Sequence, residues 1–181
     1  MKDSDLYMKE YKLQSEADEV LREYWVTETF LTWQWWLLVA LTVLPWLLWL
    51  KVVDRKRFFE ILTYGMLVKV VATFLDALGV EFDFWDYQIR LIPLFDVFIA
   101  YDFSVLPVSY MLVYQYFSSW KSFLLASIAL SALFAFIAEP LLVYMNFYHM
   151  VKWGHIYSFP FFFAVAVFIK GLMALLKKLS G

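Results

Sequence analysis

The sequence predicts an all-α membrane protein, a polytopic transmembrane bundle of about five spans with an N-terminal extramembrane helix. Of its 181 residues, 64% are hydrophobic and 22% aromatic, whereas soluble domains are about 45–50% apolar. Several apolar runs are long enough to cross the roughly 30 Å hydrocarbon core of a bilayer. Tryptophans stand near both ends of the first run, as is typical of a segment with two membrane interfaces. Together these observations indicate that most of the chain lies in lipid.

Charge and cysteine content exclude several classes of function. The net charge is -2, so the chain has no strongly basic face for nucleic-acid phosphates. Because the sequence contains no cysteine, it forms no disulfide, thiolate nucleophile or cysteine metal site. We expect the lipid bilayer as a partner, no nucleic acid and no cofactor.

Residues 1–30 are predicted to be an acidic extramembrane helix or tail, and residues 31–181 the transmembrane bundle. Positions 1–28 carry four basic and eight acidic side chains. Ser15 and Asp18 fit a capping box, which predicts a helix beginning near Glu16. This helix could simply be solvated, or it could dock on a partner or on the membrane surface.

Five apolar segments follow, each a candidate span. They are residues 32–50, 58–80, 97–117, 122–146 and 156–176. The third is the hardest to delimit, because Pro93, Asp96 and Asp102 interrupt its beginning. Residues 91–100 could therefore form a re-entrant or interfacial entry segment.

The basic residues predict the orientation. The short loop after the first span contains Lys51, Arg55, Lys56 and Arg57, and such clusters remain in the cytoplasm. Five spans then place the protein in the cytoplasmic membrane with its N-terminus outside and its C-terminus inside. The four basic residues of the N-terminal tail count against this orientation.

Ionisable residues inside the predicted spans mark the candidate site, because a charge in hydrocarbon normally faces protein, water or a partner. Helical rise places Asp76, Asp102 and Glu139, which belong to three different spans, at a similar depth in the outer half of the membrane. The ligand-binding candidates are Glu139, Asp102, Asp76, Lys69, Asn146 and His149, with Trp85, Trp153 and Tyr157 at the rim.

Three interpretations of this polar cluster stay open. The acids could be paired internally, with Lys69 as one partner, in a structural or partner-binding subunit. They could instead bind a cation or relay protons, or form the polar wall of a pocket for a lipid or other amphiphile. Pro140 frees the carbonyl near Phe136 from its helical donor, which would leave room for water or a cation beside Glu139.

An enzymatic role has little support in the sequence. His149 and His155 lie six residues apart, outside any His-Glu-x-x-His pattern, and no serine lies in a Gly-x-Ser-x-Gly turn. We therefore predict no catalytic residues, while the identity of any metal stays open.

Three short segments resemble a known family. They are residues 77–101, the tripeptide Ala138-Glu139-Pro140, and residues 152–160. They are similar to a group of small polytopic membrane proteins of endospore-forming bacteria, over about the last two-thirds of the chain. The resemblance implies a helical bundle in a bacterial inner membrane and carries no assigned activity. We expect the bundle to form a homo-oligomer or to join a membrane-protein partner.

Overall fold

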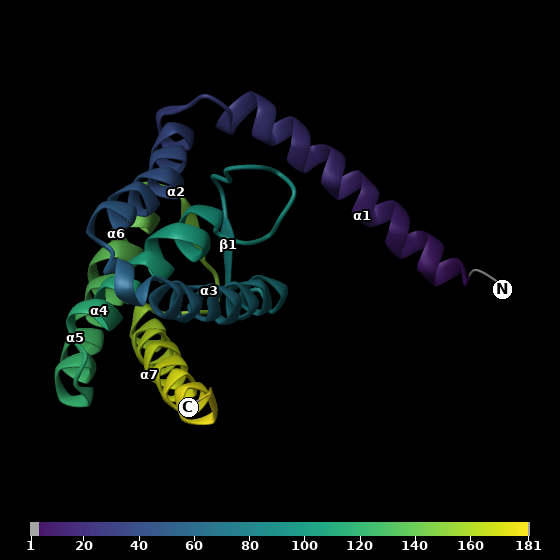
Figure 1. The fold of residues 1–181 in the computed structure, drawn as a ribbon. Coiled ribbons are helices and arrows are strands. Elements are labelled where there is room, and N and C mark those ends of the chain that lie inside the picture. The colour runs from purple at the N-terminus through teal and green to yellow at the C-terminus, as the bar shows by residue number, and fades with distance from the viewer. Residues whose placement is uncertain (1–3, 181) are drawn as a thin grey trace.

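The computed structural model describes residues 4–180, and its fold is almost wholly helical (Figure 1). The α-helices are α1 Asp5–Tyr24, α2 Trp33–Val52, α3 Phe58–Glu81, α4 Leu106–Tyr116, α5 Trp120–Leu133, α6 Glu139–Tyr144 and α7 His155–Ser180. Wider π-helical turns, η1 Trp25–Thr29, η3 Tyr101–Val105 and η4 Phe134–Ala138, and a short 3₁₀ turn, η2 Arg55–Arg57, join them. Two short strands, β1 Trp85–Tyr87 and β2 Tyr148–Met150, pair antiparallel. The all-α fold class is confirmed.

Within residues 4–180, four helices are long and apolar enough to cross a membrane. They are Trp33–Val52, Arg55–Glu81, Trp120–Tyr144 and His155–Leu179. The predicted span at 97–117 is not among them. Its regular part, α4, has only 11 residues, of which seven are buried against the rest of the protein. Because this segment faces protein rather than lipid, it can keep polar residues that a lipid-facing helix would exclude.

The helix α1 begins at Asp5, so the prediction of a start near Glu16 was wrong. The actual N-cap is Ser4, whose hydroxyl accepts a hydrogen bond from the Tyr7 backbone N–H at 3.2 Å. No side chain of α1 is buried, and Figure 1 shows this helix leading away from the other helices. The extramembrane location predicted for this helix stays a prediction.

Proline explains the position of two wide turns. Pro107 lies just after η3 and Pro140 just after η4. Proline has no N–H to donate to the preceding turn, so the regular helical ladder is interrupted there. In both helices the residue before the proline instead donates its N–H five residues back: Leu106 to the Tyr101 carbonyl and Glu139 to the Phe134 carbonyl.

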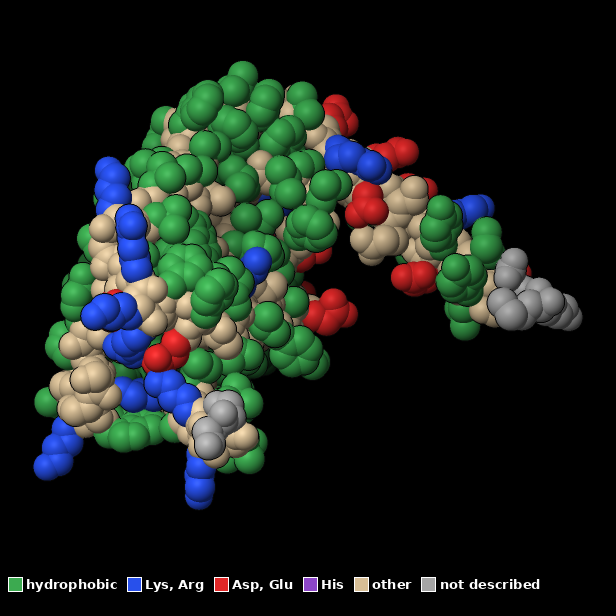
Figure 2. Space-filling model, viewed as in Figure 1, with side chains coloured by type: hydrophobic (Ala, Val, Ile, Leu, Met, Phe, Trp, Pro, Cys, Tyr) green, Lys and Arg blue, Asp and Glu red, His purple; other side chains and the backbone are tan. Residues whose placement is uncertain are grey.

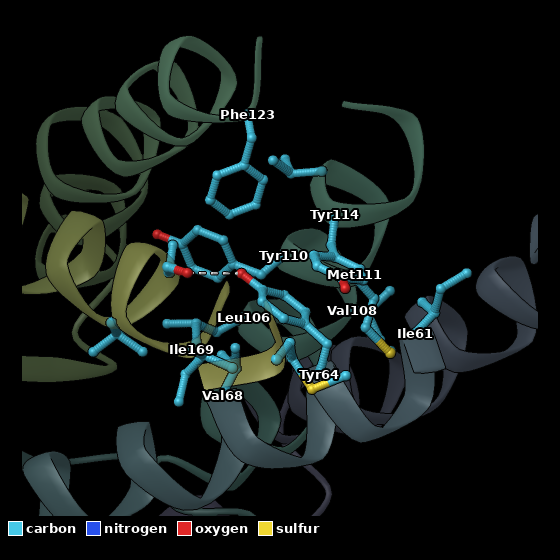
Figure 3. Packing of buried hydrophobic residues seen from close by; sticks show 14 of the residues in the cluster. Ile61, Tyr64, Val68, Leu106, Val108, Tyr110, Met111, Tyr114, Phe123 and Ile169 are labelled. Atoms are coloured by element: carbon cyan, nitrogen blue, oxygen red, sulfur yellow. Dashed lines mark hydrogen bonds between the residues drawn. The ribbon is translucent and has the colours of Figure 1, made fainter. Parts of the chain in front are cut away.

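The main hydrophobic core lies where α3, α4, α5 and α7 meet, and Figure 3 shows Tyr64, Tyr110, Tyr114 and Phe123 gathered there. The rings of Tyr64 and Tyr114 stack at 4.2 Å. The Tyr64 hydroxyl donates to the Ala166 carbonyl at 3.2 Å, and the Tyr110 hydroxyl donates to the Phe162 carbonyl at 3.0 Å. The buried phenols are thus satisfied by carbonyls of α7, which fixes this helix against α3 and α4.

A second, smaller core lies beneath the strand pair. In the strand register Trp85 faces Met150 and Tyr87 faces Tyr148. The buried side chains of this core are Leu38, Tyr87, Ile89, Phe98, Ala100, Phe147 and Tyr148. Residues 88–98 form an irregular loop, and helix resumes only at residue 99. Most of residues 91–100 is therefore non-helical, and the re-entrant or interfacial entry segment considered for them stays a prediction.

Lysine and arginine side chains gather at the end of the molecule that holds the C-terminus (Figure 2). At that end Glu60 accepts hydrogen bonds from Arg57 at 2.9 Å, Lys177 at 2.7 Å and the Tyr114 hydroxyl at 2.8 Å. This cluster joins α3, α4 and α7. A basic end agrees with the positive-inside rule, and the predicted orientation of the two termini stays a prediction.

Candidate functional site

A cavity of about 290 Å³ lies between α3, η3, α6 and α7, next to the strand pair. Its walls hold three acidic side chains, Asp76, Asp102 and Glu139. Most of the remaining wall is aromatic: Phe82, Phe84, Trp85, Tyr87, Phe98, Tyr101, Tyr110, Tyr148, Trp153, Phe161 and Phe162. The volume lies near the lower end of small-molecule sites, which begin at about 300 Å³. An apolar cavity with a few convergent polar groups is the usual form of such a site.

The carboxylate of Asp76, on α3, is fully engaged by protein donors. One oxygen accepts from the Trp85 indole at 2.9 Å and also from the Tyr87 hydroxyl. The other accepts from the Phe98 backbone N–H at 2.9 Å. Burial raises the pKa of Tyr87 well above its usual range, so this phenol stays protonated and donates. These bonds hold the strand and the irregular loop against the end of α3.

Glycine at position 79 makes this arrangement possible. A Cβ at Gly79 would lie 2.0 Å from the Trp85 ring, far inside van der Waals contact. The missing side chain lets the indole lie flat enough on α3 to reach Asp76, one helical turn earlier.

The second acid, Asp102, lies on η3 and is only 4% exposed. Its carboxyl lies against that of Asp76. Among residues 4–180 its Oδ2 atom has no hydrogen-bond partner, and neither has the buried hydroxyl of the adjacent Tyr101. Buried polar groups are nearly always paired, so two neighbouring unpaired atoms on one cavity wall call for an explanation. Wide helical turns such as η3 are frequent at functional sites.

The third acid, Glu139, is 7% exposed and begins α6 directly after η4. Its Oε2 lies 3.0 Å from Nδ1 of His155, the first residue of α7. The nearby Ser158 hydroxyl accepts from the Trp153 indole at 2.9 Å. The first contact joins α6 to α7, and the second joins the preceding loop to α7.

The mouth of the cavity is apolar. Leu78, Phe82 and Phe161 line it and are 36%, 59% and 49% exposed. Leu78 and Phe161 belong to helices long and apolar enough to span a membrane, and Phe82 directly follows the end of one. Exposed apolar side chains therefore frame this opening of the cavity.

The structure brings half of the predicted ligand-binding residues together. Asp76, Asp102 and Glu139 share the cavity, and Trp85 and Trp153 lie on its wall. Tyr157 lies behind Trp153, with ring centroids 5.5 Å apart, and is not part of the lining.

The other predicted residues lie elsewhere. The Lys69 ammonium lies 3.9 Å from the ring centroid of Phe103 rather than beside a carboxylate. Asn146 occupies a left-handed turn position with φ 58°, and His149 lies on β2; both are exposed. Helical depth alone could not show which way these side chains point.

Sequence reasoning missed Tyr87, Tyr101, Tyr148, His155 and Ser158 as parts of the site. Only Tyr101 has a signal in the sequence, its position next to Asp102. The others come from strands or helix ends whose packing is set by the whole fold.

In the part of the chain that the structure describes, no three His, Cys, Asp or Glu side chains are grouped so as to hold a metal ion. No family model, curated protein or solved structure matches the chain. The resemblance to membrane proteins of endospore-forming bacteria stays an expectation, and the function must be argued from the cavity.

Proposed function

We propose that this is an integral membrane protein that binds an amphiphile in the cavity, taking it up from the surrounding lipid. The observation that supports this most directly is the pairing of an apolar, exposed mouth at Phe82 and Phe161 with a buried polar wall at Asp76, Asp102 and Glu139. An amphiphile is the class of ligand that fits both ends, since its apolar part can remain near the mouth while its head group reaches the acids.

Two alternative ligands fit the same walls less well. A hard metal cation takes about six to eight oxygen ligands, whereas Asp76 and Glu139 are already engaged by protein donors. A proton relay needs a chain of polar groups towards water, and the mouth offers aromatic and aliphatic side chains instead.

The proposal can be tested with brominated amphiphiles, because bromine quenches nearby indoles and Trp85 and Trp153 line the cavity. Protein in nanodiscs of neutral lipid is titrated with 12-bromododecanol and with 12-bromododecylamine. We expect saturable quenching of tryptophan fluorescence by at least one of them. Ala72 lines the cavity, so the larger ring of Ala72→Phe fills part of its volume and should abolish the saturable component of the quenching.

Ala129→Phe is the matched control, because Ala129 is exposed on α5 and does not line the cavity. This variant should bind like the wild type, with thermal unfolding used to confirm that both variants are folded. If neither ligand gives quenching that Ala72→Phe removes, the proposed function is wrong.

A second candidate function, binding of a protein partner, is favoured by α1. Its 20 residues bury no side chain, and they include exposed apolar residues such as Leu6, Tyr11 and Leu13. A single helix without tertiary contacts is only marginally stable in water, so a partner surface would stabilise it. Deleting residues 1–24 should reduce the oligomeric mass measured by light scattering in detergent. An unchanged mass would count against assembly through α1.

A further inference from the structure

We infer that the ligand of the cavity is a lipophilic amine, an apolar body carrying a protonated nitrogen, and that Asp102 holds its ammonium group. The inference rests on the proposed function and adds the chemistry of the head group. It follows from the charge of the walls, from the unpaired oxygens of Tyr101 and Asp102 on η3, and from the aromatic lining.

The charge of the walls selects against an anion. The described residues that line the cavity include three carboxyl side chains and no lysine, arginine or histidine. A fatty acid or a phosphate head group would be buried beside like charges, and His155, the basic side chain next to the wall, is already engaged by Glu139. Such burial is strongly unfavourable. A cationic head group meets a complementary wall.

Asp102, whose carboxyl lies against that of Asp76, is the acid with an oxygen that accepts no hydrogen bond. Asp76 already accepts three hydrogen bonds, and Glu139 is paired with His155. The Oδ2 atom of Asp102 and the hydroxyl of Tyr101 are buried without partners among residues 4–180. An ammonium group has three N–H donors, and one of them would supply the donor that Oδ2 of Asp102 lacks.

The aromatic lining suits a cation with an apolar body. Tyr87 stacks on Phe98 and on Tyr148, with ring centroids 5.0 Å and 5.7 Å apart, and Phe98 stacks on Tyr101 at 6.2 Å. The faces of such rings attract organic cations. The same rings, with Phe161 and Phe162, present the apolar surface along which a hydrocarbon body would lie.

The test compares head groups on one chain. Wild-type protein in neutral-lipid nanodiscs is titrated with 12-bromododecylamine, 12-bromododecanol and 12-bromododecanoate. The quenching of the fluorescence of the cavity tryptophans by each ligand is measured. Ala72→Phe supplies the background from nonspecific partition into lipid. We expect the amine to bind at least about tenfold more tightly than the alcohol, as one charge-assisted hydrogen bond provides, and the carboxylate to bind most weakly.

Asp102→Asn should bring the affinity ratio of amine to alcohol close to one, because it keeps the shape and removes the charge. Asp83→Asn is the matched control, since Asp83 is 75% exposed and paired with Lys152 outside the cavity; its ratio should equal that of the wild type. If the amine preference survives in Asp102→Asn, or is absent from the wild type, the inference is overturned.

A second measurement keeps the inference testable if Asp102→Asn fails to fold. Wild-type protein alone should prefer 12-bromododecylamine to its N-acetyl derivative, which has the same chain without the charge. If both ligands bind equally and Ala72→Phe abolishes the binding of both, the inference of an amine head group is refuted and the proposed function stands. Loss of all saturable binding would refute both.

Discussion

The indole of Trp46 on α2 donates its N–H to the backbone carbonyl of Phe103 at 3.0 Å. In a regular helix that carbonyl would accept from residue 107, but Pro107 has no N–H to give. A tryptophan from a neighbouring helix thus satisfies a carbonyl that proline leaves unpaired. Because η3 also carries Tyr101 and Asp102, this contact supports the wall of the cavity.

We expect Trp46→Phe to lower the free energy of unfolding by about 1–3 kcal/mol, because it leaves a part-buried carbonyl without this donor. Pro107→Ala supplies a backbone N–H, so the Trp46→Phe effect should be smaller in a Pro107→Ala background. Unfolding in mixed micelles titrated with SDS provides the measurement. Trp36→Phe, at a 55% exposed position, serves as the control; equal effects in both backgrounds would contradict the role assigned to Trp46.

Gly79→Ala should be destabilising by about 1–3 kcal/mol, since a methyl group there overlaps the Trp85 ring. Adding Trp85→Leu should restore part of the loss by removing the obstructing ring. Gly171→Ala is the matched control, because a Cβ at Gly171 meets nothing within 4 Å. There alanine should be neutral or stabilising by up to about 1 kcal/mol through helix propensity. Thermal unfolding measures the stability of each variant. Similar losses of stability at both glycines would show that the Trp85 contact is not the cause.

Tyr87→Phe tests the hydrogen bond to Asp76 through its pH dependence. Burial raises the pKa of Tyr87 in the folded protein, while an unfolded tyrosine titrates near pH 10. Above about pH 10 the unfolded state loses a proton that the folded state keeps, so this tyrosine's contribution to stability falls by up to about 1.4 kcal/mol per pH unit.

The variant should therefore be less stable than the wild type at pH 8, by about 1.5–3 kcal/mol, and the difference should shrink between pH 10 and pH 11. Unfolding titrations at these pH values measure it, with Tyr116→Phe, at a 62% exposed residue, as control. A difference that stays constant or widens with pH would contradict this assignment.

Arg90→Met should loosen the loop at residues 88–98 without unfolding the protein. Arg90 pairs with Asp86 at 3.0 Å and with Asp96, and its side chain is 11% exposed while those of both acids are more than half exposed. Exposed pairs contribute about 0–1 kcal/mol each, so global stability should change little. Hydrogen–deuterium exchange of the loop amides should become faster. Lys152→Met removes the exposed pair with Asp83 and should leave this loop unchanged; unaltered exchange in Arg90→Met would count against the role of Arg90.

Much of the fold could be predicted from local sequence because lipid requires long, continuous apolar helices. Four of the five predicted spans match helices that can cross a membrane. The prediction was less accurate for α4, whose buried position depends on its neighbours. It was also wrong about the start of α1, because Ser4 and Ser15 are both plausible N-caps from sequence alone.

The sequence by itself determined that this protein is a bundle of membrane helices and that Asp76, Asp102 and Glu139 belong to one layer of it, since hydropathy and helical rise are local properties. Only the tertiary structure decided which of these acids is satisfied. Tyr87 and His155 are brought to Asp76 and Glu139 by the strand pair and by α7, whereas Asp102 keeps a buried oxygen that accepts no hydrogen bond within residues 4–180. Hydrogen-bond partners depend on side-chain direction and on contacts between distant segments, and no local pattern encodes either.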